Sequence, residues 1–246
     1  MMFIGDFMRK KSPRYQNEEE FSPKEKFVKK EKRYDINFIP ANHNQELYWK
    51  ALHSNTIIVA HGSAGTGKSL EATTYAMKEI SKGNYDRLIL CRANVPTGRT
   101  LGSFPGTVEE KLLPWLGNII GYCKDIVGAK VVDCWLKGEF PKIILTPIET
   151  IRGKSFNDSI ILVEEAQQLD FNELKTITTR IGRNSKLILT GDPAQRDTRT
   201  KALEEFVDLA HRYKISGFSA IKFFPEDIIR SDIVKELIIA FEKEFL

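Results

Sequence analysis

The sequence contains few cysteines and no long apolar segment. Its three cysteines, Cys91, Cys123 and Cys134, form no CxxC pair, which excludes a disulfide framework and the common cysteine-based zinc sites. No apolar run reaches the roughly 18 to 20 residues that span a bilayer, and the N-terminal residues lack the charge, apolar stretch and small-residue order of a signal peptide. We therefore expect a cytoplasmic protein in a reducing compartment, without a membrane partner.

A large charge excess is absent as well. The formal net charge is +4, and residues 1–33 alone hold ten Lys and Arg against six Asp and Glu, so residues 34–246 carry no net charge. Because they show little hydrophobic periodicity, residues 1–33 are predicted to form a flexible basic arm, and residues 34–246 one domain. The arm fits two roles, a tether that binds nucleic acid or another partner by displacing counterions, or a solvating tail.

The domain is predicted to have a doubly wound α/β fold. Short, almost continuously apolar runs are typical of buried parallel strands, and here they alternate with segments of helical periodicity. This alternation places crossover helices on both faces of a parallel sheet. The strands are expected at 56–60, 87–91, 142–146, 160–163, 186–190 and 219–224, and the helices at 69–81, 108–127, 171–181, 202–212 and 231–245.

The strongest chemical motif is a glycine-rich segment that follows the first predicted strand and opens the first predicted helix. It fits the pattern G-x-x-x-x-G-K-[ST], which in this context predicts a phosphate-binding loop. Its backbone N–H groups would face the α- and β-phosphates, Lys68 would reach the β- and γ-phosphate oxygens, and the Ser69 hydroxyl would bind Mg²⁺. The residues of the motif are Gly62, Ser63, Ala64, Gly65, Thr66, Gly67, Lys68 and Ser69.

Two carboxylates follow the apolar strand at 160–163. A phosphate-binding loop needs an acidic residue at a strand end to complete the magnesium shell, and usually another to orient the attacking water. We assign Glu164 to the metal and Glu165 to the water, because neighbouring residues at a strand end point in different directions. The alternative is a pair of solvent-facing acids at the start of a helix.

Further polar residues lie near other strand ends, where ligands of open α/β sheets bind. Gln195, in the segment 190–195, is a candidate for contacting a γ-phosphate, although Gly191 and Pro193 are equally compatible with an ordinary turn. Arg92 is either a contact for nucleic-acid phosphates or an ordinary ion-pair partner. Trp115 is expected to pack in the core rather than to stack on a base.

In combination, these motifs are similar to those of a known group of proteins. GSAGTGKS at 62–69, EEAQ at 164–167 and GDPAQ at 191–195 resemble the P-loop, the acidic motif and the GDxxQ motif of superfamily 1 helicase-like ATPases. The resemblance narrows to the PhoH family on four further stretches and covers roughly residues 42–242. These stretches are RANVP at 92–96, LGSFPG at 101–106, IRGKSF at 151–156 and DIIR at 227–230.

The resemblance implies a RecA-like P-loop NTPase fold, ATP with Mg²⁺ as cofactors, handling of RNA or single-stranded DNA, and a ring-shaped homo-oligomer, expected to be a hexamer. Arg230 takes the place of an arginine that would complete a neighbouring subunit's site as an arginine finger. Gln45 resembles a glutamine that reads adenine through its carboxamide. The family usually has aspartate where this chain has Glu164, which predicts slow hydrolysis.

The expected function is therefore ATP hydrolysis coupled to binding or remodelling of RNA or single-stranded DNA, as in a helicase-like enzyme. Two alternatives stay open. One is a nucleotide-gated assembly or binding module that does not hydrolyse ATP, and the other is a small-molecule kinase built on the same loop. Phosphate release without an added acceptor distinguishes the ATPase from both alternatives.

Overall fold

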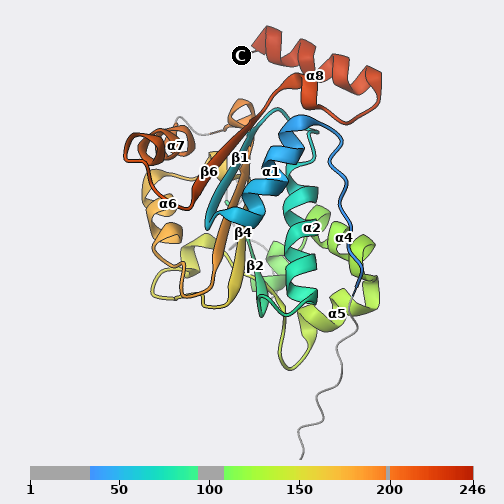
Figure 1. Ribbon diagram of the computed structural model, residues 1–246, viewed down its shortest axis with the longest axis vertical. Coiled ribbons are helices and arrows are strands. Elements are labelled where there is room, and N and C mark those ends of the chain that lie inside the picture. Colours follow the sequence, from blue (N-terminus) through green and yellow to red (C-terminus); the bar gives the residue numbers. More distant parts are fainter. Residues whose placement is uncertain (1–33, 94–107, 198–199, 246) are drawn as a thin grey trace, which may run out of the picture. The chain divides into compact units, whose positions relative to one another are not determined.

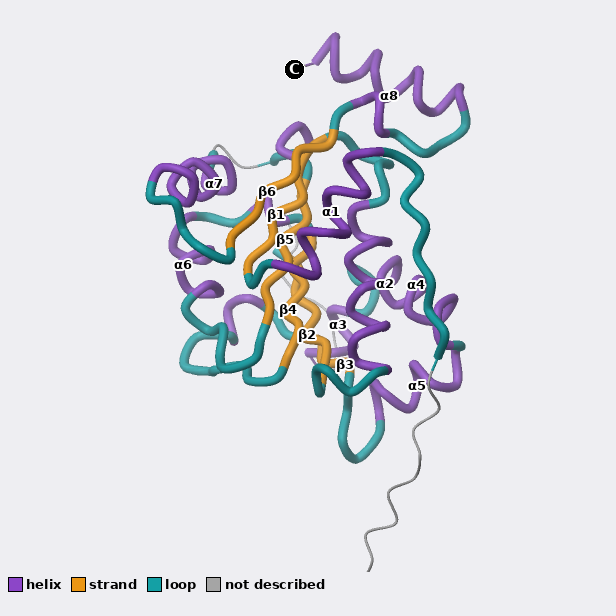
Figure 2. Tube along the Cα trace, viewed as in Figure 1, coloured by secondary structure: helices purple, strands orange, loops and turns teal. Residues whose placement is uncertain are grey.

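A six-stranded parallel sheet organises the domain, with the strand order β3-β2-β4-β5-β1-β6 (Figures 1 and 2). The computed structural model describes residues 34–93, 108–197 and 200–245, and the predicted arm at 1–33 lies outside them. All six predicted strands are confirmed, with ends that differ by two residues at most. The strands are β1 (Ile57–Gly62), β2 (Arg87–Arg92), β3 (Ile143–Leu145), β4 (Ser159–Glu164), β5 (Lys186–Gly191) and β6 (Phe218–Phe223).

Helices cover both faces of the sheet, so the predicted doubly wound α/β fold is confirmed. Successive side chains of a strand point to opposite faces, and on β4 Ile160 and Leu162 join one apolar core while Ile161 and Val163 join the other. The first core packs against α1 (His43–Ser54), α2 (Lys68–Ser81), α4 (Gly117–Val127) and α5 (Ala129–Lys137), and the second against α6 (Phe171–Thr178) and α7 (Ala202–Arg212) (Figure 1).

The structure differs from the predicted helices in three respects, of which the smallest is that α6 ends at Thr178, three residues before the predicted end. The helix expected over 108–127 is broken into α3 (Val108–Leu112) and α4, because Pro114 lacks an N–H group and its ring clashes with the preceding turn. Two helices were not predicted, α1 and α5. Both are short, with 12 and 9 residues, and α5 fully buries only Val132.

The carboxyl ends of the strands lead into the short connections that build the site. These connections include the 3₁₀ turns Ala166–Gln168 after β4, Pro193–Gln195 after β5 and Pro225–Asp227 after β6. The last helix, α8 (Asp232–Phe245), follows at the same edge, at the top of Figure 1. No described helix is long and apolar enough to cross a membrane.

One buried acid, Glu71 on α2, interrupts the apolar packing around this helix. The side chain of Glu71 is inaccessible to solvent, and neither of its carboxyl oxygens has a hydrogen-bond partner among the described residues. Burial raises the pKa of Glu71 to about 9. The carboxyl group is therefore neutral in the folded protein at pH 7, and its burial without hydrogen bonds costs stability.

We expect Glu71→Met to raise the free energy of unfolding by about 1–3 kcal/mol at neutral pH, because it removes this uncompensated polar group. At pH values between 4.5, the ordinary pKa of glutamate, and about 9, the pKa of Glu71 in the folded protein, Glu71 loses its proton only when the wild type unfolds. Wild-type stability therefore falls as pH rises through this window, and the advantage of the variant grows. Urea denaturation from pH 5 to 9 measures this difference.

Glu205→Met, at an exposed position on α7, is the matched control. Its free energy of unfolding should stay within about 0.5 kcal/mol of the wild-type value at each pH. A Glu71→Met variant that is no more stable than wild type at pH 8 would contradict the burial argument.

Candidate functional site

The segment 62–69 forms a tight loop between β1 and α2. Gly62 and Gly67 have φ angles of +116° and +88°, which side chains rarely adopt. A Cβ atom at Gly62 would lie 2.0 Å from the carbonyl oxygen of Phe223 on the neighbouring strand β6. The glycines are therefore required by the backbone geometry, and the loop ends at the N-terminus of a helix, where anions bind favourably.

Lys68 points back into the curve of this loop. Its Nζ donates hydrogen bonds to the carbonyl oxygens of Gly62 and Ser63, both at 2.7 Å, and to Oγ1 of Thr66 at 3.2 Å. Burial lowers the pKa of Lys68, while the carboxylates of Asp192 and Glu164 act in the opposite direction. The ammonium group is thus largely removed from water and lies within the loop, where it interacts strongly with an anion.

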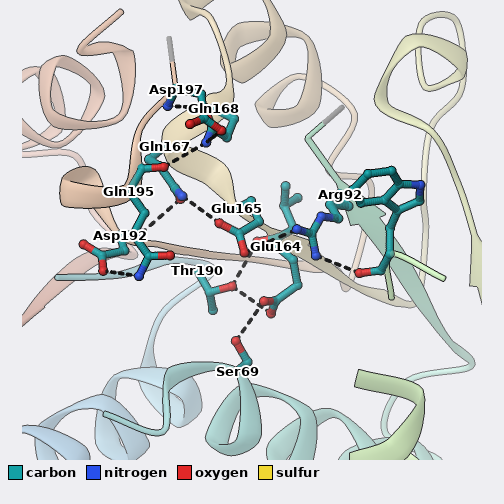
Figure 3. Close-up of polar contacts among 12 residues, drawn as sticks. Ser69, Arg92, Glu164, Glu165, Gln167, Gln168, Thr190, Asp192, Gln195 and Asp197 are labelled. Atoms are coloured by element: carbon teal, nitrogen blue, oxygen red, sulfur yellow. Dashed lines mark hydrogen bonds and ion pairs between the residues drawn. The ribbon is translucent and has the colours of Figure 1, made fainter. Parts of the chain in front are cut away.

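The two predicted metal ligands lie next to each other. Glu164 accepts a hydrogen bond from Oγ of Ser69 at 2.8 Å and another, on its second oxygen, from Oγ1 of Thr190 at 2.8 Å (Figure 3). Glu164 is buried, and this burial raises its pKa, opposed by the hydrogen bonds from Thr190 and Ser69. Strands β4 and β5 and the start of α2 together build this three-residue contact.

Glu165, the predicted water-orienting residue, points in a different direction from Glu164, as expected. Its φ angle is +55°, an uncommon left-handed conformation for a residue with a side chain. One carboxylate oxygen lies 3.5 Å from the guanidinium of Arg92, and the other accepts a hydrogen bond from Nε2 of Gln167 at 2.6 Å (Figure 3). Arg92 thus forms the ion pair that was one of its two predicted roles.

Trp115 is not a core residue, which corrects the prediction. Its side chain is 39% exposed because it lies in the turn that Pro114 makes between α3 and α4. The guanidinium of Arg92 lies over the Trp115 ring, 5.6 Å from the ring centroid. The turn therefore brings this aromatic ring to the edge of the site.

Gln195 and Asp192 complete the opposite side. Nε2 of Gln195 donates to Oδ2 of Asp192 at 2.9 Å, and the backbone N–H of Ala194 donates to Oδ1 at 3.0 Å. Burial raises the pKa of Asp192, whereas these hydrogen bonds and the charge of Lys68 lower it. The segment 190–195 thus contains a turn, which was one of its two predicted roles. It also places Gln195 and Asp192 at the cavity beside the phosphate-binding loop.

These groups surround one cavity of about 200 Å³. Gln45, Gly62 and Ser63 are the predicted site residues that do not line it. Six lining residues were not assigned a role from the sequence: Leu70 on α2, Asn118 and Tyr122 on α4, and Thr190, Gly191 and Asp192. Asn118 and Tyr122 are spaced as one face of a helix, but this spacing carries no chemical signal. The full lining is Ala64, Gly65, Thr66, Gly67, Lys68, Ser69, Leu70, Asn118, Tyr122, Glu164, Glu165, Thr190, Gly191, Asp192, Gln195 and Arg230.

Arg230 lines the cavity of its own chain. The backbone N–H of Ile229 donates to the carbonyl oxygen of Gly65 at 2.9 Å, which holds the start of the α8 segment against the loop. A Cβ atom at Gly65 would lie 3.1 Å from Cγ of Arg230. The arginine is therefore packed directly on the loop.

Gln45 braces the loop from behind. Its Nε2 donates to the carbonyl oxygen of Thr66 at 2.9 Å, and its Oε1 accepts from the N–H of Ala41 at 2.7 Å. The side chain is only 2% exposed, and a Cβ atom at Gly67 would lie 2.6 Å from Nε2. Both ends of the carboxamide are thus bonded to backbone groups, whereas the family resemblance implied a contact with adenine.

Comparison with known proteins agrees with this geometry. A family model described as PhoH-like protein matches residues 37–242. The chain belongs to the PhoH-like protein family. A PhoH-like protein of Bacillus subtilis (strain 168) is 30% identical over 202 residues, which cover 81% of this chain and 62% of that protein. Protein PhoH of Escherichia coli (strain K12) is 28% identical over 201 residues, 81% of this chain and 57% of that protein.

This PhoH-like chain spans less than two thirds of the length of these relatives. Among solved structures, the large terminase of the thermophilic bacteriophage D6E superimposes with a TM-score of 0.54 at 14% sequence identity, over 83% of this chain and 52% of the terminase chain. At this identity the likeness concerns the fold alone. It confirms the RecA-like P-loop NTPase arrangement expected from the motifs.

The position of Gln45 leads to a test that separates the two roles. We expect Gln45→Ala to weaken the binding of ADP and GDP alike, by about 5- to 30-fold, because loss of a buried hydrogen bond to the loop costs roughly 1–2 kcal/mol. A residue that reads adenine would instead lose affinity for ADP alone. Calorimetric titration with the two diphosphates measures this difference.

Asn44→Ala, on the same helix, is the control, because Asn44 bonds Asp227 rather than the loop. Its affinity for both diphosphates should remain within about threefold of the wild-type value. A Gln45→Ala variant that loses affinity for ADP but not for GDP would overturn the bracing role and restore the adenine contact.

Proposed function

We propose that this chain is an ATPase that acts at the P-loop cavity. The observation that carries the proposal is the contact between Ser69 and the buried carboxylate of Glu164 beside the loop, with Glu165 next in the chain. A metal-binding acid followed by a second, water-orienting acid is what hydrolysis at a P-loop requires. The D6E large terminase has been solved with ADP and with ATP-gamma-S, which supports a nucleotide as the ligand.

We propose Mg²⁺ as the metal, with Ser69 and Glu164 as its protein ligands. A hydroxyl and a carboxylate are the hard oxygen donors that Mg²⁺ prefers, and this ion is usually held by few protein groups together with substrate phosphates. The described residues contain no group of three or more His, Cys, Asp or Glu side chains that could hold a metal ion without such phosphates. When bound, the ion would neutralise charge on the β- and γ-phosphate oxygens.

The remaining roles follow from position. Lys68 binds the phosphates, since its ammonium group lies inside the loop. Glu165 orients the attacking water and accepts its proton, and Gln195 faces the γ-phosphate from the opposite side of the cavity. For Arg230 we propose the arginine-finger role, for which it would have to leave its own loop to reach a neighbouring subunit.

We further propose a homo-oligomer, as a ring of six, that binds RNA or single-stranded DNA. Three apolar side chains at helical spacing, Ile233, Leu237 and Phe241, are 48–66% exposed along α8, beside the cavity that Arg230 lines. A second copy of the chain would bury this stripe. The basic residues of the segment 1–33 supply the phosphate-binding charge that the neutral domain lacks.

A cytoplasmic location is proposed from the cysteines. Cys91 and Cys123 are buried free thiols, and Cys134 is an exposed free thiol. Burial raises the pKa of both buried thiols to about 12, which keeps them unreactive. Three free thiols suit a reducing compartment.

A nucleotide-gated module without turnover is the second candidate, and the size of Glu164 favours it. Glutamate is one methylene longer than the usual aspartate, and here it is buried with both oxygens already hydrogen-bonded. Such a module would bind ATP without releasing phosphate. A small-molecule kinase would release phosphate from ATP only onto an added acceptor.

We expect Lys68→Ala to abolish phosphate release from ATP, with a loss of at least roughly 100-fold, because the ammonium group that binds the transferred phosphate is removed. Lys82→Ala, at the exposed C-terminal end of α2, should keep the wild-type rate. Malachite-green detection of phosphate without any acceptor, with circular dichroism as a check of folding, measures both. Full activity of a folded Lys68→Ala protein would contradict the assignment.

For the nucleic-acid partner, we expect RNA or single-stranded DNA to stimulate ATP hydrolysis. Replacing Lys29, Lys30, Lys32 and Arg33 with Gln should weaken binding and make it less dependent on salt, because fewer counterions are released, while the basal rate stays unchanged. Replacing Glu18, Glu19 and Glu20 with Gln should strengthen binding. Unchanged binding in both variants would leave the segment 1–33 as a solvating tail.

A further inference from the structure

The carboxylate of Glu165 is held from two sides by residues that the proposed reaction has not yet used. Gln167 approaches one oxygen from the turn after β4, and Arg92 approaches the other from the end of β2 (Figure 3). Glu165 itself stands at the end of β4, which pairs with β2 in parallel register, with Arg92 opposite Glu164. The position of this side chain is thus determined by groups from two neighbouring strand ends.

The side-chain amide of Gln167 can adopt only one orientation, the one in which it donates to Glu165. Its side chain is almost fully buried, and its Oε1 accepts a hydrogen bond from the backbone N–H of Asp192 at 3.0 Å. Because that backbone group is a donor, the amide oxygen must face Asp192 and the NH₂ group must face Glu165. A Cβ atom at Gly191 would lie 2.7 Å from this oxygen, so the glycine of the GDPAQ segment leaves room for the bridge.

Arg92 is fixed in turn by the Trp115 connection. Its NH1 donates to the carbonyl oxygen of Trp115 at 2.7 Å, and the guanidinium lies over the Trp115 ring. Only the other side of the guanidinium remains for Glu165, at 3.5 Å. The arginine is therefore anchored between α3 and α4, and the carboxylate of Glu165 is drawn towards that anchor.

Stability alone does not account for this arrangement. The side chains of Arg92 and Glu165 are 26% and 34% exposed, and ion pairs of that kind contribute about 0–1 kcal/mol. Glu165 also has a left-handed backbone conformation, with φ at +55°, which costs about 1 kcal/mol or more. The ion pair therefore does little more than offset the backbone strain, and together with the hydrogen bond from Gln167 it determines the direction of the carboxylate.

We propose that Arg92 and Gln167 are positioning residues that hold the Glu165 carboxylate in the orientation needed to accept a proton from the attacking water. The inference depends on the proposed ATP hydrolysis. Gln167 links Glu165 to Asp192 after β5, and Arg92 links it to the Trp115 turn. Neither residue lines the cavity, so both act through Glu165 rather than on the nucleotide.

The test compares Arg92→Ala, Arg92→Lys and Gln167→Glu in the full chain. We expect Arg92→Ala and Gln167→Glu to lower kcat about 10- to 100-fold, while KM for ATP and Kd for ADP stay within about threefold. Gln167→Glu keeps the shape and the acceptor for Asp192 but replaces the donor to Glu165 with an oxygen. Arg92→Lys, which keeps the charge near Glu165, should recover part of the lost rate.

Arg196→Ala is the matched control. Arg196 forms an ion pair with Glu204 at 2.6 Å, and the two side chains are 20% and 33% exposed, close to the values for Arg92 and Glu165. This pair does not touch Glu165, so kcat should remain within about twofold of the wild-type value. Adding Arg92→Ala to Glu165→Gln should lower the residual single-turnover rate no further, because residues that act as a unit are not additive.

Three results would overturn the proposal. The first is that Arg92→Ala and Gln167→Glu both match the Arg196→Ala control, the second is that their losses fall on KM rather than kcat, and the third is that Arg92→Ala lowers the rate equally with and without Glu165. In each case the wild type still hydrolyses ATP, and only the positioning role fails. A wild type that binds ATP and releases no phosphate would instead refute the proposed function, and the positioning role with it.

Discussion

The hydrogen bond between Ser69 and Glu164 joins the parts of the molecule that the site needs. Ser69 is the last residue of the phosphate-binding motif and lies in the first turn of α2, whereas Glu164 ends β4, which β5 separates from β1. Thr190 on the intervening strand β5 donates to the same carboxylate. The buried carboxylate thus depends on two parallel strands and the start of a helix, because an unpartnered charge at this depth would be far more costly.

The parallel direction of the strands explains why the polar groups of the site gather at one edge of the sheet. All strands run in one direction, so their carboxyl ends meet there. Lys68, Asp192 and Gln195 come from different connections and surround one cavity. A tight connection can also exclude a side chain where two backbones approach closely, as at Gly62, where a Cβ atom would collide with the carbonyl oxygen of Phe223. The apolar strands fix the geometry, and the connections supply the chemistry.

Much of this could be predicted from the sequence, because continuous apolar runs and the glycine-rich motif are strong local signals. The adjacency of Ser69 and Glu164 follows from the same motifs. The helices α1 and α5 are short, with 12 and 9 residues, so their apolar residues repeat over few turns. The brace from Gln45 to the loop and the contact of Arg92 with Glu165 join residues distant in sequence. Such contacts depend on tertiary packing, which local patterns do not contain.

The most direct test of the account is Glu165→Gln, measured for ATP binding and for phosphate release in the same preparation. Glutamine keeps the size but has one acceptor oxygen instead of two, so it keeps the contact with Arg92 or with Gln167 but not both, and it cannot accept a proton from water. The account predicts an ATP affinity within about threefold of the wild-type value and a release rate lowered by roughly 100-fold or more. A folded variant that binds ATP and releases phosphate at the wild-type rate would contradict it.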